Sequence, residues 1–249
     1  MQDQEAPAAR RGRFISIEGP DGGGKTLIAA ALRDALEGRG IRVRLTREPG
    51  GTSVGDRVRS IVLDHVPDDQ PLAARADALL FAAARAQHVN EVIEPALARG
   101  ETVICARYAD SSVAYQGYGL GLPLDDVVAL QAFATGGLLP DRTLLLDLPV
   151  EVGLARKQDD ERTRFEAGFD VTYHRRVRAG FLAIAAAEPN RYRTIDATAP
   201  VDGYAGATFD RQRNALTRAV REREIDPASA TDIIREIDAR QEAATPPLD

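Results

Sequence analysis

The chain has 249 residues, of which 44% are hydrophobic and 28% charged, a composition typical of a globular protein with one large domain. Its formal net charge of −6 argues against a surface that coats a nucleic acid polymer, because such a surface needs clustered lysine and arginine. The chain has one cysteine, Cys105, no apolar run long enough to span a bilayer and no N-terminal signal core, so we expect a cytoplasmic protein and no membrane partner.

Residues 1–12 are polar without periodicity and are predicted to form a disordered tail. From Arg13 onward, short apolar runs alternate with longer helical patterns, and this alternation predicts an α/β fold. The expected strands are 13–18, 41–46, 102–106, 143–148 and 191–196, and the expected helices are 25–38, 53–64, 72–99, 110–118, 124–136 and 168–187. We therefore predict three α/β/α layers, with a five-stranded parallel sheet covered on both faces.

The last segment, 201–249, has a different character. It contains two charge-rich helical stretches with only a thin apolar stripe, and we expect a C-terminal helical extension to the 13–200 domain. Packing over the edge of the sheet explains such helices more simply than binding of a partner, and both alternatives remain open.

The stretch "IEGPDGGGKT" contains the Walker A pattern, Gly-x-x-x-x-Gly-Lys-Thr, between a predicted strand and a predicted helix. In this context, successive backbone N–H groups and the helix N-terminus hold phosphate oxygens. The lysine reaches the transferred phosphoryl group, and the threonine hydroxyl binds Mg²⁺. The residues expected to bind ATP in this loop are Gly19, Gly22, Gly23, Gly24, Lys25 and Thr26.

The same loop contains a carboxylate, Asp21. A negative charge that pointed into the phosphate nest would repel the ligand, so the side chain should point outward. There it either accepts a hydrogen bond from a hydroxyl group of the phosphoryl acceptor or merely shapes the turn.

Two further motifs are weak signals on their own. The loop "TREPGGT" follows the second strand, where an open α/β sheet places its ligand crevice, and it offers Arg47 as a phosphate contact. The helix "FAAARAQH" places Phe81 and Arg85 on one face, an arrangement that suits a base ring with exocyclic oxygens. An ordinary loop, and a core phenylalanine beside a surface arginine, would explain these patterns equally well.

Together the motifs are more specific. The ordered run of "IEGPDGGGKT", "TREPGGT", "FAAARAQH", "ARYADSSVAYQG", "LLLDLPVEVGLAR" and "IDAT" resembles the bacterial thymidylate kinases over about residues 13 to 200. The resemblance implies the architecture of a P-loop nucleoside monophosphate kinase with a helical lid, and phosphoryl transfer from ATP to dTMP with Mg²⁺. It also implies a homodimer, although core packing within one chain explains the Ala/Leu-rich helix at 72–99 equally well.

The resemblance implies a role for each residue of the acceptor-base site. Phe81 would stack on thymine, and Arg85 would donate a hydrogen bond to its carbonyl edge. Ser112 and the nearby Gln116 would complete recognition of the ring, and Pro49 would lie near the 5-methyl group.

The resemblance also implies how the rest of the acceptor is held. Asp21 would accept a hydrogen bond from the 3′-hydroxyl of the sugar, and Tyr115 would crowd a ribose 2′-hydroxyl. Arg47, Arg59 and Arg107 would surround the acceptor phosphate, although each could instead form a surface salt bridge.

Members of the resembled family carry a catalytic arginine either in the phosphate loop or in the lid. Here Gly22 stands where the first kind has arginine, so we expect the lid, about residues 155–166, to supply it. Arg164 is the first choice because it lies in "TRFE", where relatives have a similar Asp-Arg-x-Glu. Arg156 is expected to contact ATP, and Glu166 to lie at the metal. The lid cations are Arg156, Lys157, Arg162 and Arg164, and the expected catalytic residues are Lys25, Arg107, Arg164 and Arg162.

Two positions depart from the pattern of the resembled family. Ala106 stands where relatives usually have an aspartate near Mg²⁺, and Thr163 replaces an aspartate in the lid. Three interpretations follow: an active kinase with altered metal dependence, a kinase for another or modified deoxynucleotide, or an impaired regulatory relative that only binds nucleotide. Retention of Lys25, Thr26 and Arg107 favours the first.

Overall fold

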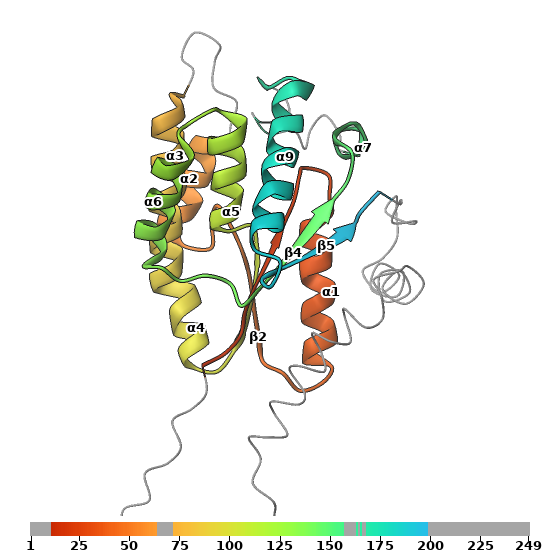
Figure 1. The fold of residues 1–249 in the computed structure, drawn as a ribbon. Helices are drawn as coiled ribbons and strands as arrows, with labels where there is room; N and C mark the ends of the chain where they lie inside the picture. The colour runs from red at the N-terminus through yellow and green to blue at the C-terminus, as the bar shows by residue number, and fades with distance from the viewer. Residues whose placement is uncertain (1–10, 64–71, 157–162, 164, 166–167, 199–249) are drawn as a thin grey trace, which may run out of the picture. The chain divides into compact units, whose positions relative to one another are not determined.

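The structure, a computed structural model, describes residues 11–63, 72–156, 163, 165 and 168–198. Five strands and their connecting helices make up this part of the chain (Figure 1). The strands are β1 (Phe14–Glu18), β2 (Val43–Arg47), β3 (Thr102–Ala106), β4 (Arg142–Asp147) and β5 (Tyr192–Asp196). The helices are α1 (Lys25–Glu37), α2 (Ser53–Leu63), α3 (Ala74–His88), η1 (Val89–Ile93), α4 (Glu94–Ala98), α5 (Ala109–Ser112), η2 (Val113–Gly119), α6 (Leu124–Thr135), α7 (Val150–Ala155) and α9 (Val171–Ala187).

The sheet confirms the predicted fold class. All of its strand pairs are parallel and their order is β2-β3-β1-β4-β5. Every residue of β1 and β3 is buried, as expected for inner strands covered on both faces, whereas the edge strands β2 and β5 are partly exposed. In Figure 1, α1 lies on one side of the strands, and α2 to α6 lie together on the other.

The predicted helix at 72–99 is a succession of three helical segments, α3, η1 and α4, with η1 in a wider π-helical turn. Pro95 lies in the first turn of α4. Because proline has no N–H and its ring clashes with the carbonyl of the preceding turn, the regular α-helical hydrogen bonds cannot continue through it. The predicted helix at 110–118 is likewise divided into α5 and η2.

The parallel arrangement brings the carboxyl ends of the strands to one edge of the sheet. The residues that follow β1 form the glycine-rich loop, and β1 lies between β3 and β4. The loops that follow β1, β2 and β3 therefore share one edge, where an open α/β sheet binds its ligands.

Several sequence predictions fall on other parts of the chain. The tail up to residue 10, most of the lid and the C-terminal extension at 201–249 lie outside the described residues. Residue 12, at the end of the expected tail, donates its backbone N–H to the Leu97 carbonyl at 2.8 Å. No helix within the described ranges is long and apolar enough to cross a membrane.

Candidate active site

The glycine-rich loop has the backbone shape of an anion nest. Gly19, Gly22 and Gly24 have φ angles of 136°, 75° and 79°, which residues with a side chain rarely adopt. A Cβ built on Gly24 would meet no atom within 4 Å, so this glycine faces open space. The Lys25 ammonium donates to the carbonyls of Gly19 at 3.0 Å and Pro20 at 2.7 Å, and therefore lies folded over the loop.

Gly22 is held against helix α7. A Cβ on Gly22 would lie 2.1 Å from the Gly153 carbonyl oxygen, and a Cβ on Gly153 would lie 2.3 Å from the Asp21 carbonyl oxygen. This backbone-to-backbone contact leaves no room for a side chain at position 22 in this arrangement. It gives a structural reason why the loop has no arginine there.

Asp21 points away from the nest, as the sequence argument expects. Its carboxylate pairs with the Arg107 guanidinium and accepts a hydrogen bond from the Tyr115 hydroxyl at 2.7 Å. Arg107 also donates to that hydroxyl at 3.1 Å. Arg107 follows β3 with a φ of 71°, a left-handed conformation that costs a residue with a side chain about 1–3 kcal/mol and is common at functional sites.

Arg59 lies near two other arginines, Arg47 and Arg107. The Arg59 guanidinium donates to the Pro49 carbonyl at 2.9 Å. Burial lowers the pKa of Arg59, and the positive charges of Arg47 and Arg107 lower it further. Arg59 therefore lies close to the other two cations, and such a group is suited to a ligand with more than one negative charge.

Arg85, on helix α3, is buried next to Ser112 of α5. Its side chain is 1% exposed, and Nε donates to Glu48 Oε2 at 2.7 Å. Nη1 donates to Ser112 Oγ at 3.0 Å and to Gln131, and Nη2 donates to the Tyr108 carbonyl at 3.0 Å. Four of the five guanidinium N–H groups therefore have protein acceptors, and the fifth, on Nη2, has none within the part of the chain that the structure describes.

Gln116 lies one turn after Ser112. Its Nε2 donates to Asp77 at 2.9 Å, which fixes the orientation of the amide. Its Oε1 is buried and has no hydrogen-bond partner among the described residues. A buried acceptor of this kind normally indicates a missing ligand or water.

Phe81 is half-buried on α3. Its ring lies 6.2 Å from the ring of Phe165, at an angle of 50°. Phe165 also packs edge-on against Tyr115, with ring centroids 5.5 Å apart. Pro49, which follows a cis peptide bond, is buried in the loop that faces this region.

Comparison with known proteins identifies the family. The thymidylate kinase family profile matches residues 17–204. The chain belongs to the thymidylate kinase family.

Individual relatives agree. The chain is 51% identical to the thymidylate kinase of Deinococcus radiodurans over 193 residues, which cover 77% of this chain and 92% of that protein. It is 49% identical to the thymidylate kinase of Pseudomonas fluorescens over 195 residues, which cover 76% and 90%. The crystal structure of the thymidylate kinase from Ehrlichia chaffeensis matches with a TM-score of 0.58 and 32% identity, covering 74% of this chain and 93% of that one.

Glu18, at the end of β1, is a buried carboxylate that directly precedes the glycine-rich loop of this thymidylate kinase family member. It accepts hydrogen bonds from the Tyr108 N–H at 2.7 Å and from the Ser111 hydroxyl at 2.6 Å. Burial, and the negative charge of Asp110, raise the pKa of Glu18 from its ordinary 4.5 to about 7. Glu18 therefore links β1 to the start of α5, beside Arg107.

Ala106, one of the two positions at which we expect a departure from the family pattern, lies at the end of β3. Ala106 is buried, and it pairs in register with Ile17 of β1 and Arg47 of β2. Its carbonyl accepts a hydrogen bond from the Glu48 N–H at 3.0 Å. Ala106 thus lies between the ends of β1 and β2, and the loops that follow these two strands form the site.

The start of the lid is partly described. Arg156 donates to the carbonyls of Ala197 at 2.9 Å, Thr198 at 2.8 Å and Gly22 at 3.3 Å, so it joins the end of α7 to the phosphate loop and to the end of β5. The other expected lid residues, Lys157, Arg162, Arg164 and Glu166, lie outside the described residues.

The residues that hold the expected site residues in place, mostly polar ones, belong to no motif of their own. The only available signal was position, because Glu48 lies between Arg47 and Pro49, and His88 lies one turn after Arg85 on the same helix. The residues missed in this way are Glu48, Asp77, His88, Ser111, Gln131 and Phe165.

Proposed function

We propose that this thymidylate kinase family member transfers the γ-phosphoryl group of ATP to dTMP, giving dTDP and ADP. ATP lies along the nest of Gly19, Gly22, Gly23 and Gly24, with Lys25 at the transferred group. A phosphate oxygen of the acceptor attacks the γ-phosphorus in line. Since that oxygen is already anionic, catalysis consists mainly of positioning and charge stabilisation.

The observation that carries this proposal is the orientation of Asp21. Its carboxylate points away from the phosphate nest, pairs with Arg107 and accepts a hydrogen bond from Tyr115, and Arg107 in turn lies near Arg59. A hydrogen bond from the deoxyribose 3′-hydroxyl to Asp21 would place the acceptor phosphate between the arginines and the loop. Tyr115 would then lie against the 2′ position and disfavour ribonucleotides.

The base side offers hydrogen-bonding groups that match thymine. The remaining Nη2 N–H of Arg85 is a donor for the O4 carbonyl, and the unpartnered Oε1 of Gln116 is an acceptor for N3–H. Cytosine presents the opposite pattern, with an amino group at position 4 and a lone pair on N3. Ser112 holds the guanidinium in place, Phe81 supplies a stacking surface, and Pro49 closes the side of the 5-methyl group.

The loop fits a magnesium ion. Thr26 is exposed in the first turn of α1, next to the open space at Gly24, and a hydroxyl oxygen is a ligand that Mg²⁺ accepts. With bound ATP, Mg²⁺ would neutralise charge on the phosphates. Thr26 and Glu166 would hold the ion, Arg156 would contact ATP, and Arg164 with Arg162 would stabilise the transferred group.

The remaining elements of the proposal concern assembly and location. Helices α3 and α6 pack together and expose Leu79, Val128 and Phe133, whose exposed fractions are 57%, 52% and 88%. Exposed apolar side chains of this kind support a homodimer. A single buried cysteine supports a cytoplasmic location.

The test is ADP formation from ATP with dTMP, dUMP, dCMP, dGMP or ribo-TMP as acceptor. We expect the highest kcat/KM with dTMP in both the native chain and Ala106→Asp, and a lower Mg²⁺ requirement in the variant. Turnover only with another acceptor, or ATP binding without turnover, would overturn the proposal. Neither alternative is favoured, because the thymidylate kinase family match covers residues 17–204.

A further inference from the structure

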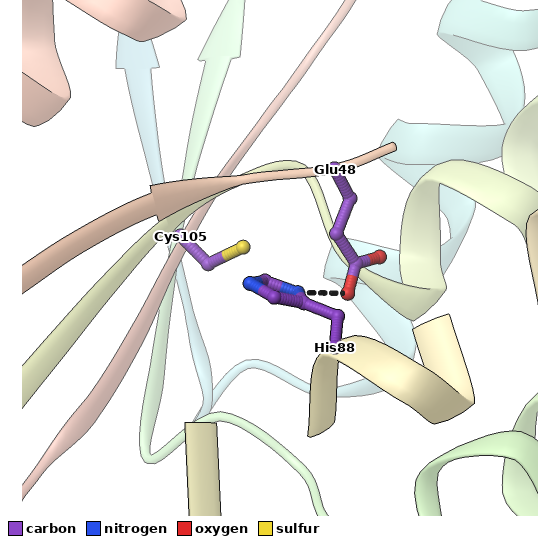
Figure 2. A group of neighbouring side chains, drawn as sticks. All are labelled: Glu48, His88 and Cys105. Carbon is purple, nitrogen blue, oxygen red and sulfur yellow. Dashed lines mark hydrogen bonds and ion pairs between the residues drawn. The ribbon is translucent and has the colours of Figure 1, made fainter. Parts of the chain in front are cut away.

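A buried cluster lies beneath the acceptor-base site. It consists of Glu48, His88 and Cys105, from the loop after β2, the end of α3 and strand β3, and all three side chains are buried. Figure 2 shows the His88 ring between the Cys105 sulfur and the Glu48 carboxylate. The His88 Nδ1 lies 2.9 Å from Glu48 Oε1, and Nε2 lies 2.7 Å from the Thr46 hydroxyl.

The bonding within this cluster argues against a metal centre. The two ring nitrogens of His88 face opposite directions and each already has a partner, so no single ion can replace both contacts. The Cys105 thiol donates to the Arg107 carbonyl at 3.0 Å. Burial raises the pKa of this thiol well above its ordinary value, so it is protonated and is a poor metal ligand.

The arrangement instead connects His88 to Arg85. The two carboxylate oxygens of Glu48 have different partners: Oε1 faces His88, and Oε2 faces the Arg85 Nε. An ionised carboxylate has no proton to give, so the His88 Nδ1 carries the hydrogen and donates it. The same ring then accepts a hydrogen bond from the Thr46 hydroxyl, which fixes its plane.

The separate use of the two Glu48 oxygens limits how many hydrogen bonds Glu48 accepts from the Arg85 guanidinium. Arginine and carboxylate groups commonly pair through two parallel hydrogen bonds, which here would use Nε and an N–H of Nη2. His88 occupies the oxygen that the second bond would need. The Nη2 atom therefore keeps one N–H that is not used by Glu48, Ser112, Gln131 or Tyr108.

We propose that His88 is a positioning residue for recognition of the acceptor base, acting through Glu48 on Arg85. By holding one oxygen of Glu48, it prevents the carboxylate from capturing the Arg85 N–H that would donate to the position-4 oxygen of the pyrimidine. This inference rests on the proposed role of Arg85 in binding the base.

The test compares two ligands that share the sugar, the phosphate and the 5-methyl group but differ at the edge that Arg85 reads. Calorimetry measures the Kd of dTMP and of 5-methyl-dCMP for the native chain and for His88→Asn, His88→Gln and His88→Leu. Asparagine places an amide N–H near the position of Nδ1, whereas glutamine reaches only the position of Nε2. The Kd of ATP and the melting temperature are measured for each variant.

We expect the Kd ratio of 5-methyl-dCMP to dTMP to fall about tenfold in His88→Gln and His88→Leu, as for loss of a hydrogen bond to a charged group. His88→Asn should stay within about threefold of the native ratio, as expected when the N–H group is kept. The ATP Kd should be unchanged in all three. If the leucine variant does not fold, the asparagine and glutamine pair decides the question, because a purely structural role would not separate them by base discrimination.

Arg85→Met separates the role of His88 from the proposed role of Arg85 in binding the base. A lower ratio in Arg85→Met with native ratios in His88→Gln and His88→Leu would overturn the role of His88 and leave the proposed function intact. A native ratio in Arg85→Met would overturn the assignment of Arg85 to the base, and the role of His88 with it.

Discussion

The Tyr115 hydroxyl donates a hydrogen bond of 2.7 Å to the Asp21 carboxylate and so joins helix η2 to the phosphate loop. Arg107 donates to the same hydroxyl at 3.1 Å and pairs with Asp21, so the three side chains form a closed triangle. Burial and the nearby Asp21 charge raise the pKa of Tyr115 well above its ordinary value, which keeps its hydroxyl a donor at neutral pH. The orientation of Asp21 therefore depends on a residue from a different part of the chain.

Tyr115→Phe should remove the hydrogen bond from Tyr115 to Asp21 while leaving the ring against the sugar. We expect kcat/KM for dTMP to fall about fivefold, since a single hydrogen bond contributes about 1 kcal/mol, and KM for ATP to stay unchanged. Steady-state kinetics with each substrate varied in turn measures both. Tyr118→Phe, on the same helix, is the matched control and should retain native kinetics; equal losses in both variants would refute a specific role for Tyr115.

Lys25 and Phe81 should separate the chemical step from acceptor binding. Lys25→Ala removes a cation from the transferred group and should lower kcat about 100- to 1,000-fold, as for other groups that stabilise charge in the transition state. Phe81→Ala removes a stacking surface and should raise KM for dTMP about tenfold with a smaller change in kcat. Single-turnover kinetics distinguishes the two effects, and small, equal effects in both variants would contradict these roles.

Glu18 should make stability depend on pH. Its pKa in the folded protein, about 7, is above its ordinary 4.5, so the folded state binds more protons between these values. Its contribution to stability is therefore fully present below pH 4.5 and is lost as the pH rises through 7, by at most about 3 kcal/mol. Glu18→Gln, which keeps an acceptor for the Tyr108 N–H, should remove this dependence.

Urea unfolding at pH 5, 6, 7 and 8 measures the free energy of unfolding of both proteins. The native chain should lose stability relative to Glu18→Gln as the pH rises across this range. Parallel curves for the two proteins would show that Glu18 titrates near its ordinary pKa, and that its burial does not hold the proton.

The set of exposed apolar side chains on α3 and α6 should be buried in a homodimer. Phe133, 88% exposed, is its most accessible member, and Phe133→Glu should shift the protein toward the monomer. Light scattering after size-exclusion chromatography measures the molar mass. Leu182→Glu on α9, where the leucine is 38% exposed, is the control and should leave the dimer intact. A monomeric native chain at micromolar concentration would refute the dimer.

The sequence predicted the five strands and the Walker A loop because these depend on local patterns, namely short apolar runs and glycines at fixed spacing. It also predicted the outward orientation of Asp21, since a carboxylate inside an anion nest is unfavourable in any fold. It could not predict the Gly22–Gly153 contact, because backbone approach between segments 131 residues apart leaves no periodic signal.

The same reason explains the missed support of Arg85. Glu48 is 37 residues from Arg85 and 40 residues from His88, and only the pairing of the strands brings the three together. The division of the predicted helix at 72–99 was missed for a local reason, since Pro95 was included in the helical pattern without its cost to the hydrogen-bond ladder.

The most direct test of the acceptor site is the rate of ADP formation with dTMP and with 3′-deoxy-dTMP, measured for the native chain and for Asp21→Asn. If Asp21 holds the 3′-hydroxyl, the native chain should prefer dTMP in kcat/KM by about 10- to 100-fold, as expected for a hydrogen bond to a charged group. Asp21→Asn should lose most of that preference by slowing dTMP alone. An undiminished preference in Asp21→Asn would contradict the assignment.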